Sequence, residues 1–403
     1  MMKYKLNQLG DFKNGANYPK DSYVKGDKIV NVKDLFRGRF VDESSLDELK
    51  PRVLKDKSIY QTEDGDILFT RSSLVRSGAG MCAMVHNPSQ CILFCGFIIR
   101  YRLFDKTSVY PLYLLYLLRS PQYRNLFTGN QQTNITNINQ DSLGDIDVYL
   151  PVDKNGNIDY AEQVKLVSIL DALDEKIALN KKMNQKLEAM AKRLYDYWFV
   201  QFDFPDKNGR PYKSSGGGMV WNEELKREIP EDWEVKSLAD ISQMYQPKTF
   251  DAKLLEKNGA YRVYGAGGYM GQYHEYNHEF SEIIISCRGS CGNIYKTQPF
   301  SLITSNAMIV HPNDIQLREY LYWTLVRMGV QHCIIGTVQP QITRGALAQY
   351  KLIFPSTKSI KDFNKYAAAI DQKTRQLTDE TQKLTALRDK LLPLLMNGQV
   401  VVK

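Results

Sequence analysis

The sequence predicts an α+β protein in which two β-rich α/β domains are separated by two long helices packed as an antiparallel coiled coil. Three observations lead to this prediction: one β-type segment occurs twice, a long heptad pattern follows each copy, and a short glycine- and serine-rich stretch joins the two halves. A chain of 403 residues has room for two or three domains.

The duplicated segment is clearest where ITNINQDSLGDIDVYLP ends at Pro151 and PQITRGALAQYKLIFP ends at Pro355. Aligning Ile138 with Ile342 matches five positions in one register. Each copy shows an apolar anchor, a polar turn, a short alternating strand and a proline. Five matches in one register, each followed by a long helical pattern, favour a duplicated unit over chance.

Two further matches extend the repeat toward the start of each copy. YKLNQLGDF matches WEVKSLADI, which pairs Leu6 with Val235. GDILFTRSS matches SEIIISCRGS, which pairs Arg71 with Arg288. The separation between paired residues falls steadily along the chain, as expected when two copies of one domain differ by deletions in their loops.

A long helix is predicted after each copy, over about 159 to 200 and 360 to 397. Seam positions of the first helix alternate at steps of four and three: Leu166, Leu170, Leu173, Ile177, Asn180, Asn184, Leu187, Ala191, Leu194 and Trp198. The seam of the second repeats at every seventh position: Phe363, Ile370, Leu377, Leu384 and Leu391.

Each helix is about three times the mean helix length in globular proteins, and is too long for one small β domain to cover. An intramolecular antiparallel coiled coil is therefore favoured over two helices that each pack on their own domain. Asparagines in the first seam would then fix its register. The predicted domains are a first β-rich domain at 1–151, a helix at 152–204, a linker at 205–232, a second β-rich domain at 233–355 and a helix at 356–403.

The composition is that of an ordinary globular protein, with 43% hydrophobic and 24% charged residues. No apolar run approaches the length of a membrane span, and the start MMKYKLNQLGDF lacks the apolar core of a signal peptide. We therefore expect a cytoplasmic protein.

Six cysteines without paired CxxC spacing predict reduced, mostly buried thiols and no metal site. A net charge of +8 permits nucleic-acid binding without requiring it.

Motifs of common active sites are absent from the sequence. It contains no GxxxxGK[ST] phosphate loop, HExxH, GxSxG or zinc-deaminase signature, and no Asn-Pro-Pro-aromatic motif of an amino-methyltransferase. The glycines of YGAGGYMGQYHEY do not match GxGxxG and are expected in a loop of close backbone approach. The sequence therefore predicts no catalytic site in this chain.

Polar residues at equivalent loops of the two copies are the candidate functional set. Arginine pairs with guanine edges, asparagine and glutamine pair with adenine, and hydroxyl groups suit phosphates. One such residue alone is more often a turn residue, but a set repeated in two copies favours a DNA-binding surface. The candidates are Arg71, Ser72, Ser73, Arg76, Gln131, Asn134 and Thr136 in the first copy, and Tyr264, Arg288, Ser290, Gln339, Gln341 and Arg344 in the second.

Over essentially its whole length, the chain resembles the specificity (S) subunit of type I DNA restriction–modification enzymes. The resemblance rests on the repeated I-x4-L-x2-[IY]-x-[VL]-x2-P, on YDYWFVQFDFPDKNGRPYKSSGGGMVWNEELKREIPEDWEVKSL and on YGAGGYMGQY. It implies that each β-rich domain is a target-recognition domain that reads one half of a split, asymmetric site in double-stranded DNA. The helices would set the spacing of the half-sites and dock the methyltransferase (M) subunits, and restriction (R) subunits would join that core.

The resemblance also implies a non-catalytic chain without cofactors. S-adenosylmethionine, ATP and Mg²⁺ would bind in the partner subunits of a DNA-methylating phage-defence system, with no membrane involved. Two alternatives remain: a DNA methyltransferase or nuclease with a divergent active site, and a coiled-coil scaffold whose β domains bind proteins.

Overall fold

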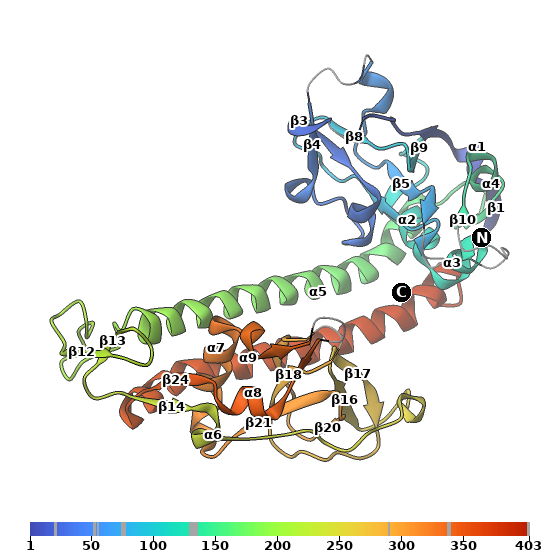
Figure 1. Ribbon diagram of the computed structural model, residues 1–403. Coiled ribbons are helices and arrows are strands. Elements are labelled where there is room, and N and C mark those ends of the chain that lie inside the picture. Colours follow the sequence, from blue (N-terminus) through green and yellow to red (C-terminus); the bar gives the residue numbers. More distant parts are fainter. Residues whose placement is uncertain are drawn as a thin grey trace. The chain divides into compact units, whose positions relative to one another are not determined.

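The computed structural model describes residues 1–19, 22–50, 54, 56–73, 78–128, 136–288, 291–336 and 340–400 (Figure 1). The chain divides into two compact units, Met1–Ala178 with Thr381–Lys403, and Leu179–Glu380. The division cuts both long helices, α5 (Tyr160–Tyr195) and α9 (Thr357–Met396), so each unit contains one part of each helix. The finer domain bounds given above stay a prediction.

The first unit is built around a mainly antiparallel sheet and a smaller sheet beside it. The main sheet has the strand order β2 (Gly10–Asn14), β9 (Ile98–Leu103), β5 (Ile67–Thr70) and β7 (Cys82–Met84). The smaller sheet has the order β4 (Asp47–Leu49), β3 (Tyr23–Val30) and β8 (Ile92–Phe94), with β3 and β8 parallel. The remaining elements are β1 (Met2–Lys5), α1 (Leu6–Leu9), β6 (Ser72–Ser73), α2 (Pro111–Arg119), α3 (Pro121–Thr128), β10 (Thr136–Asn137), α4 (Gln140–Gly144) and β11 (Asp147–Leu150).

The second unit repeats this architecture. Its main sheet has the order β15 (Ser242–Tyr245), β21 (Ala307–Pro312), β18 (Ile283–Ser286) and β19 (Ile294–Lys296). Its smaller sheet has the order β17 (Gly268–Tyr273), β16 (Tyr261–Gly265) and β20 (Ser301–Ile303), with β16 and β20 parallel. The other elements are β14 (Glu234–Ser237), α6 (Leu238–Ile241), α7 (Arg318–Met328), β22 (Ile334–Ile335), β23 (Gln341–Ile342), α8 (Arg344–Ala348) and β24 (Lys351–Phe354).

A buried tyrosine marks the duplication inside the two cores. Tyr113 on α2 and Tyr320 on α7 are 0% and 1% exposed. Tyr113 donates its hydroxyl to the carbonyl of Tyr149 at 3.3 Å, and Tyr320 donates to the carbonyl of Ile353. The alignment that matches Pro151 with Pro355 also matches Tyr149 with Ile353. The equivalent helix is therefore hydrogen-bonded to the equivalent strand in both copies.

The structure corrects the sequence alignment at the start of each copy. The Leu6 N–H donates to the Ile146 carbonyl at 3.1 Å, and the Leu238 N–H donates to the Tyr350 carbonyl at 2.8 Å. Leu6 is therefore equivalent to Leu238, and the predicted pairing with Val235 was wrong. Short alternating segments look alike after a small shift, and only the partner strand fixes the register.

The long helices pair in antiparallel fashion, as the heptad pattern predicts. Every seam position predicted on α5 and α9 is buried or partly buried. In the second unit the Asn180 side chain donates to Glu380 at 2.9 Å, and that of Asn184 donates to Thr378 at 3.2 Å. The partner numbers fall as the asparagine numbers rise, which defines antiparallel helices.

The helix pairs of the two units are equivalent when Leu166 on α5 is aligned with Phe363 on α9. In the first unit Leu166, Leu170 and Leu392 belong to one hydrophobic cluster. Their equivalents in the second unit belong to another cluster: Phe363, Ala367 and Tyr195. Because α5 and α9 are continuous helices over this range, the same alignment relates every other position along them. We call it the helix alignment.

The segment between α5 and the second domain is more structured than a simple linker. The helix passes into a π-helical turn at Asp196–Val200, and β12 (Met219–Asn222) then forms a hairpin with β13 (Arg227–Pro230) (Figure 1). Phe204 stacks on Tyr212 and on Trp233, with ring centroids 4.6 and 4.8 Å apart. This aromatic stack holds the segment against the start of the second domain.

Candidate nucleic-acid interface

In the first domain, two of the predicted loop segments lie side by side at the end of β5. The Arg71 carbonyl accepts a hydrogen bond from the Ile138 N–H at 2.8 Å, and Ser72–Ser73 pairs with Thr136–Asn137 as the β6–β10 ladder. Arg71 is exposed, with a guanidinium nitrogen 3.5 Å from the Gly96 carbonyl. The fold therefore brings Arg71 and Ser72 next to the backbone of Asn137 and Ile138.

The second domain builds the same arrangement at the end of β18. The Cys287 carbonyl accepts from the Ile342 N–H at 3.1 Å, and Arg288 forms a β-bridge with Gln341. Arg288, Gln341 and Arg344 are all exposed. Arg344 begins α8, whose N-terminus is capped by the side chain of Thr343. Two guanidinium groups and one amide thus follow the end of this strand.

The hydrogen bonds show which residues of the two loops correspond. Ile138 and Ile342 are equivalent, so the residues whose carbonyls bind them, Arg71 and Cys287, are equivalent as well. Arg288 therefore corresponds to Ser72, and the predicted equivalence of Arg71 with Arg288 was wrong by one residue. Successive residues of an extended chain point to opposite faces, so Arg71 and Arg288 do not hold the same position.

The remaining candidates divide into two groups. Arg76, Gln131, Asn134, Ser290 and Gln339 lie outside the described residues, and for Ser73 and Thr136 the backbone alone is described. Tyr264 is described and is 7% exposed, within a small cluster that includes Ile284 and Ile303. Its hydroxyl accepts a hydrogen bond from the Gln298 N–H at 3.3 Å. Tyr264 therefore supports the sheet and does not offer an exposed ring to DNA.

Each β domain is joined to a long helix through an aspartate at an equivalent position. In the first unit Arg39 lies 3.3 Å from Asp174 on α5. In the second unit Lys296 forms a salt bridge with Asp371 on α9, which the helix alignment pairs with Asp174, and lies 2.7 Å from Glu319. Because these pairs are largely shielded from solvent, they hold each loop-bearing sheet in a fixed orientation on its helix.

Comparison with known proteins assigns the family. The model of the type I restriction–modification DNA specificity domain matches residues 1–189 and 230–386. The chain belongs to this family. The resemblance found in the sequence is thereby confirmed.

Relatives in the family support the same assignment over the whole chain. The HindI specificity subunit of Haemophilus influenzae is 23% identical, covering 99% of this chain and 100% of the relative. The MjaIX specificity subunit of Methanocaldococcus jannaschii is also 23% identical, covering 93% of this chain and 87% of the relative. The crystal structure of a type I restriction–modification S subunit from M. genitalium has the same fold, with a TM-score of 0.60 at 19% identity, covering 98% of this chain and 95% of that one. The predicted fold class is confirmed.

Sequence reasoning missed a pair of buried acids within this specificity fold. Asp66 and Glu282, 0% and 2% exposed, immediately precede the strands that lead to the candidate loops. Arg102 donates to both Asp66 oxygens at 2.7 and 2.8 Å, and His311 lies 2.9 Å from Glu282. An acid directly before an apolar strand in both copies is the signal that could have found them.

A histidine lies next to the second of these pairs. The His278 Nε2 is 2.9 Å from the Tyr245 hydroxyl, and its Nδ1 is 2.6 Å from Asn277 Oδ1. These partners suit a neutral ring that donates from Nδ1 and accepts at Nε2. Burial, with a smaller effect of His311, lowers the pKa of His278 to about 4. Burial also raises the pKa of Glu282, and the hydrogen bond from His311 partly offsets this.

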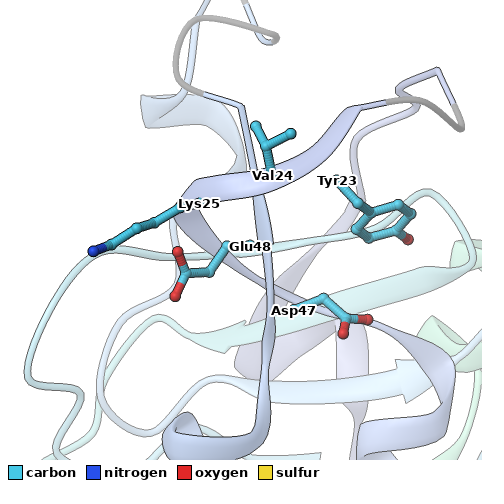
Figure 2. A pocket seen from close by; sticks show the side chains of 5 residues that line it. All are labelled: Tyr23, Val24, Lys25, Asp47 and Glu48. Atoms are coloured by element: carbon cyan, nitrogen blue, oxygen red, sulfur yellow. The ribbon is translucent and has the colours of Figure 1, made fainter.

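A hollow of about 500 Å³ lies on the smaller sheet of the first domain, lined by residues of β3 and β4 (Figure 2). Its carboxylates are Asp47 and Glu48, which lie 2.7 Å from Lys33 and 2.8 Å from Lys28. Tyr23 also lines the hollow, and its hydroxyl is 2.9 Å from that of Tyr18. None of the candidate DNA-binding residues lines this hollow, so it is not part of the candidate interface.

The cysteines and the acidic side chains show no metal-binding arrangement in the described ranges, where no three His, Cys, Asp or Glu residues could hold a metal ion. All six cysteines are unpaired, and Cys82, Cys95, Cys287 and Cys333 are buried. Burial raises the pKa of Cys82 to about 11, which keeps it a thiol. None of the described helices combines the length and apolar character needed to cross a bilayer.

Proposed function

We propose that this chain is the sequence-specific DNA-binding subunit of a type I restriction–modification complex, and that each recognition domain reads one half of a split, asymmetric site. One observation carries the proposal. In each domain an equivalent strand leads to two loop segments that lie side by side, and we call each such pair of segments a platform. The two platforms present different side chains. The first presents Arg71 and the partly buried Ser72, and the second presents Arg288, Gln341 and Arg344. One scaffold with two sets of side chains suits two unlike half-sites.

The chemistry of these side chains fits the edges of base pairs. A guanidinium can bind guanine through two hydrogen bonds, and an amide can do the same with adenine. Other basic groups would bind phosphates, so affinity would fall with salt while specificity would come from the platforms.

The family supports a division of labour in the complex. The relatives are specificity subunits of restriction enzymes. This cytoplasmic chain would therefore direct M subunits that bind S-adenosylmethionine and R subunits that use ATP and Mg²⁺, and would itself be non-catalytic. The long helices would dock the M subunits and set the gap between half-sites, because both helices continue through both units.

Methylation mapping of DNA from cells that carry the complete system tests the proposal. We expect one split adenine motif with two unlike halves and an unread gap, and its loss when this chain is deleted. A continuous motif, or a motif that survives the deletion, would contradict the proposal. Binding of S-adenosylmethionine to the isolated chain would instead favour an enzyme.

A further inference from the structure

A pocket of about 250 Å³ lies within the second unit, between α5, α7 and α9. Its lining includes Asn184, Glu188 and Ala191 from α5, Trp323 from α7 and Ile370 from α9. Pockets that hold whole ligands usually span roughly 300–1,000 Å³. This pocket is the size of one long side chain rather than of a nucleotide or a cofactor.

The first unit shows which kind of group occupies the equivalent place. In the helix alignment, Ala191 corresponds to Arg388 and Asp371 corresponds to Asp174. In the first unit Arg388 Nη1 donates to Asp174 at 2.8 Å, so a guanidinium lies beside the helix aspartate. In the second unit Arg375 on α9 supplies the guanidinium beside Asp371, and the small side chain of Ala191 lines a pocket where the first unit has Arg388.

The charges around the pocket leave one carboxylate available. Asp371 forms salt bridges with Lys296 and Arg375, and Glu319 with Lys296 and Arg318. Glu188, by contrast, is exposed at the pocket and forms no salt bridge in the part of the chain that the structure describes.

The other walls also suit a cation on an apolar stem. Asn184 Oδ1 is buried and accepts no hydrogen bond from the described residues, so an incoming donor would supply the partner that it lacks. Trp323 and Ile370 offer an apolar surface, against which the methylene chain of an arginine can pack while its charged end reaches a carboxylate. A planar group with several N–H donors matches a carboxylate and an amide oxygen better than an ammonium does.

We propose that this pocket binds an arginine side chain supplied by a protein partner, which would enter beside Ala191, the equivalent of Arg388, and place its guanidinium on Glu188 and Asn184. The inference rests on the proposed function in one respect, that the chain works within a complex of several subunits. The partner's guanidinium would bind Glu188 and not the already paired Asp371, so this contact differs from the one that Arg388 makes with Asp174 within the chain.

The first test uses the isolated full chain and three probes, the N-acetyl methylamides of arginine, citrulline and lysine, titrated by ligand-observed NMR. Citrulline has nearly the shape of arginine without the charge. We expect arginine to bind about fivefold or more tightly than either of the others, and Glu188→Gln to weaken arginine binding by about fivefold. Ala191→Arg should abolish binding, because it fills the pocket as Arg388 does in the first unit.

Arg388→Ala is the matched variant, and it should create a second arginine site beside Asp174. Equal binding of arginine and citrulline, or of arginine and lysine, would overturn the proposal. Unchanged arginine binding in Glu188→Gln would do the same, and this surface substitution keeps the test valid if Ala191→Arg does not fold.

The second test concerns the source of the arginine. Ala191→Arg should weaken association with the M subunit of the same system at least tenfold, and association at wild-type affinity would refute a partner arginine from that subunit. DNA binding is measured on the same wild-type preparation. A chain without sequence-specific DNA binding would count against the proposed function, whereas a chain that binds DNA but no arginine would count against the pocket alone.

Discussion

The two recognition domains share a backbone plan and differ in the side chains that surround it. Both tie a buried tyrosine to the last strand, and both place a buried acid before the strand that leads to the candidate interface. The basic side chain that pairs with the buried carboxylate is Arg102 in the first domain and His311 in the second. The duplication has therefore kept the positions that fix the backbone, while the ionic chemistry and the exposed platforms have diverged.

The largest effect should come from exchanging one domain of the pair. Replacing residues 233–355 with the matching unit of a related specificity subunit should replace one half of the recognised sequence. The other half and the unread gap should stay as they are, because the first domain and both helices are retained. Methylation mapping of the hybrid system measures this. A change in both halves would show that each half-site is read by the two domains together.

Removing the buried acid should affect the two domains unequally. Asp66→Asn should lower the free energy of unfolding by about 2 kcal/mol, less than the ~3–5 of a fully buried pair, because the Arg102 side chain is 22% exposed. Glu282→Gln should cost less, about 1 kcal/mol, because Glu282 pairs with a single imidazole whose side chain is 33% exposed. Chemical denaturation of each variant is the measurement. Equal losses for the two variants would mean that the two hydrogen bonds from Arg102 to Asp66 stabilise the fold no more than the contact of His311 with Glu282 does.

The arginines of the platforms should differ in their contribution to DNA binding. Arg288→Ala should weaken binding by about 1–3 kcal/mol and relax discrimination in one half-site only, if the contact is bidentate to guanine. Arg71→Ala should have a smaller effect in the other half-site, because its guanidinium also lies near the Gly96 carbonyl.

Competition binding with single-base variants of both half-sites measures these effects. Ser72→Ala is the matched control, because Ser72 corresponds to Arg288. A changed salt dependence without lost discrimination would place Arg288 on a phosphate. No change in either quantity would remove Arg288 from the interface.

An effect confined to acidic pH should come from His278. Its pKa in the folded protein is lowered to about 4 from 6.5, so the folded state favours the neutral ring. This contribution to stability is present above pH 6.5 and is lost as the pH falls from 6.5 toward 4. His278→Gln should therefore narrow the stability difference between pH 7 and pH 4.5 in urea denaturation. An equally steep loss in the variant would show that other groups cause the acid sensitivity.

The sequence predicts the helices better than the sheets. Seam residues such as Leu170 and Leu377 recur over many turns, so the heptad period identifies both the buried face and the pairing. A four-residue strand is too short to show a repeated pattern, which is why Leu6 and Arg71 were matched to the wrong residues. Strand register depends on hydrogen bonds to segments that are far away in sequence.

The sequence identified the two segments of the candidate site, but it predicted neither the burial of Tyr264 nor the contact of Asp66 with Arg102. The N–H of Ile138 binds the Arg71 carbonyl, and that of Ile342 binds the Cys287 carbonyl, so the predicted segments do meet in both domains. The burial of Tyr264 could not be read from its surroundings in sequence, because it depends on strands on both sides of β16. The contact of Asp66 with Arg102 joins residues 36 positions apart in sequence, and no local pattern records such a contact.

The unit boundary within the two helices has a consequence for protein synthesis. The second unit is one continuous stretch, Leu179–Glu380, whereas the first combines Met1–Ala178 with Thr381–Lys403. Leu392, Leu395 and Met396 are buried in the same cluster as Leu166 on α5. A ribosome that synthesises the chain from its N-terminus therefore releases all the residues of the second unit before the last segment of the first, Thr381–Lys403. The domain that is made first is completed last, and until then its part of α5 exposes an apolar face that chaperones or partner subunits can bind.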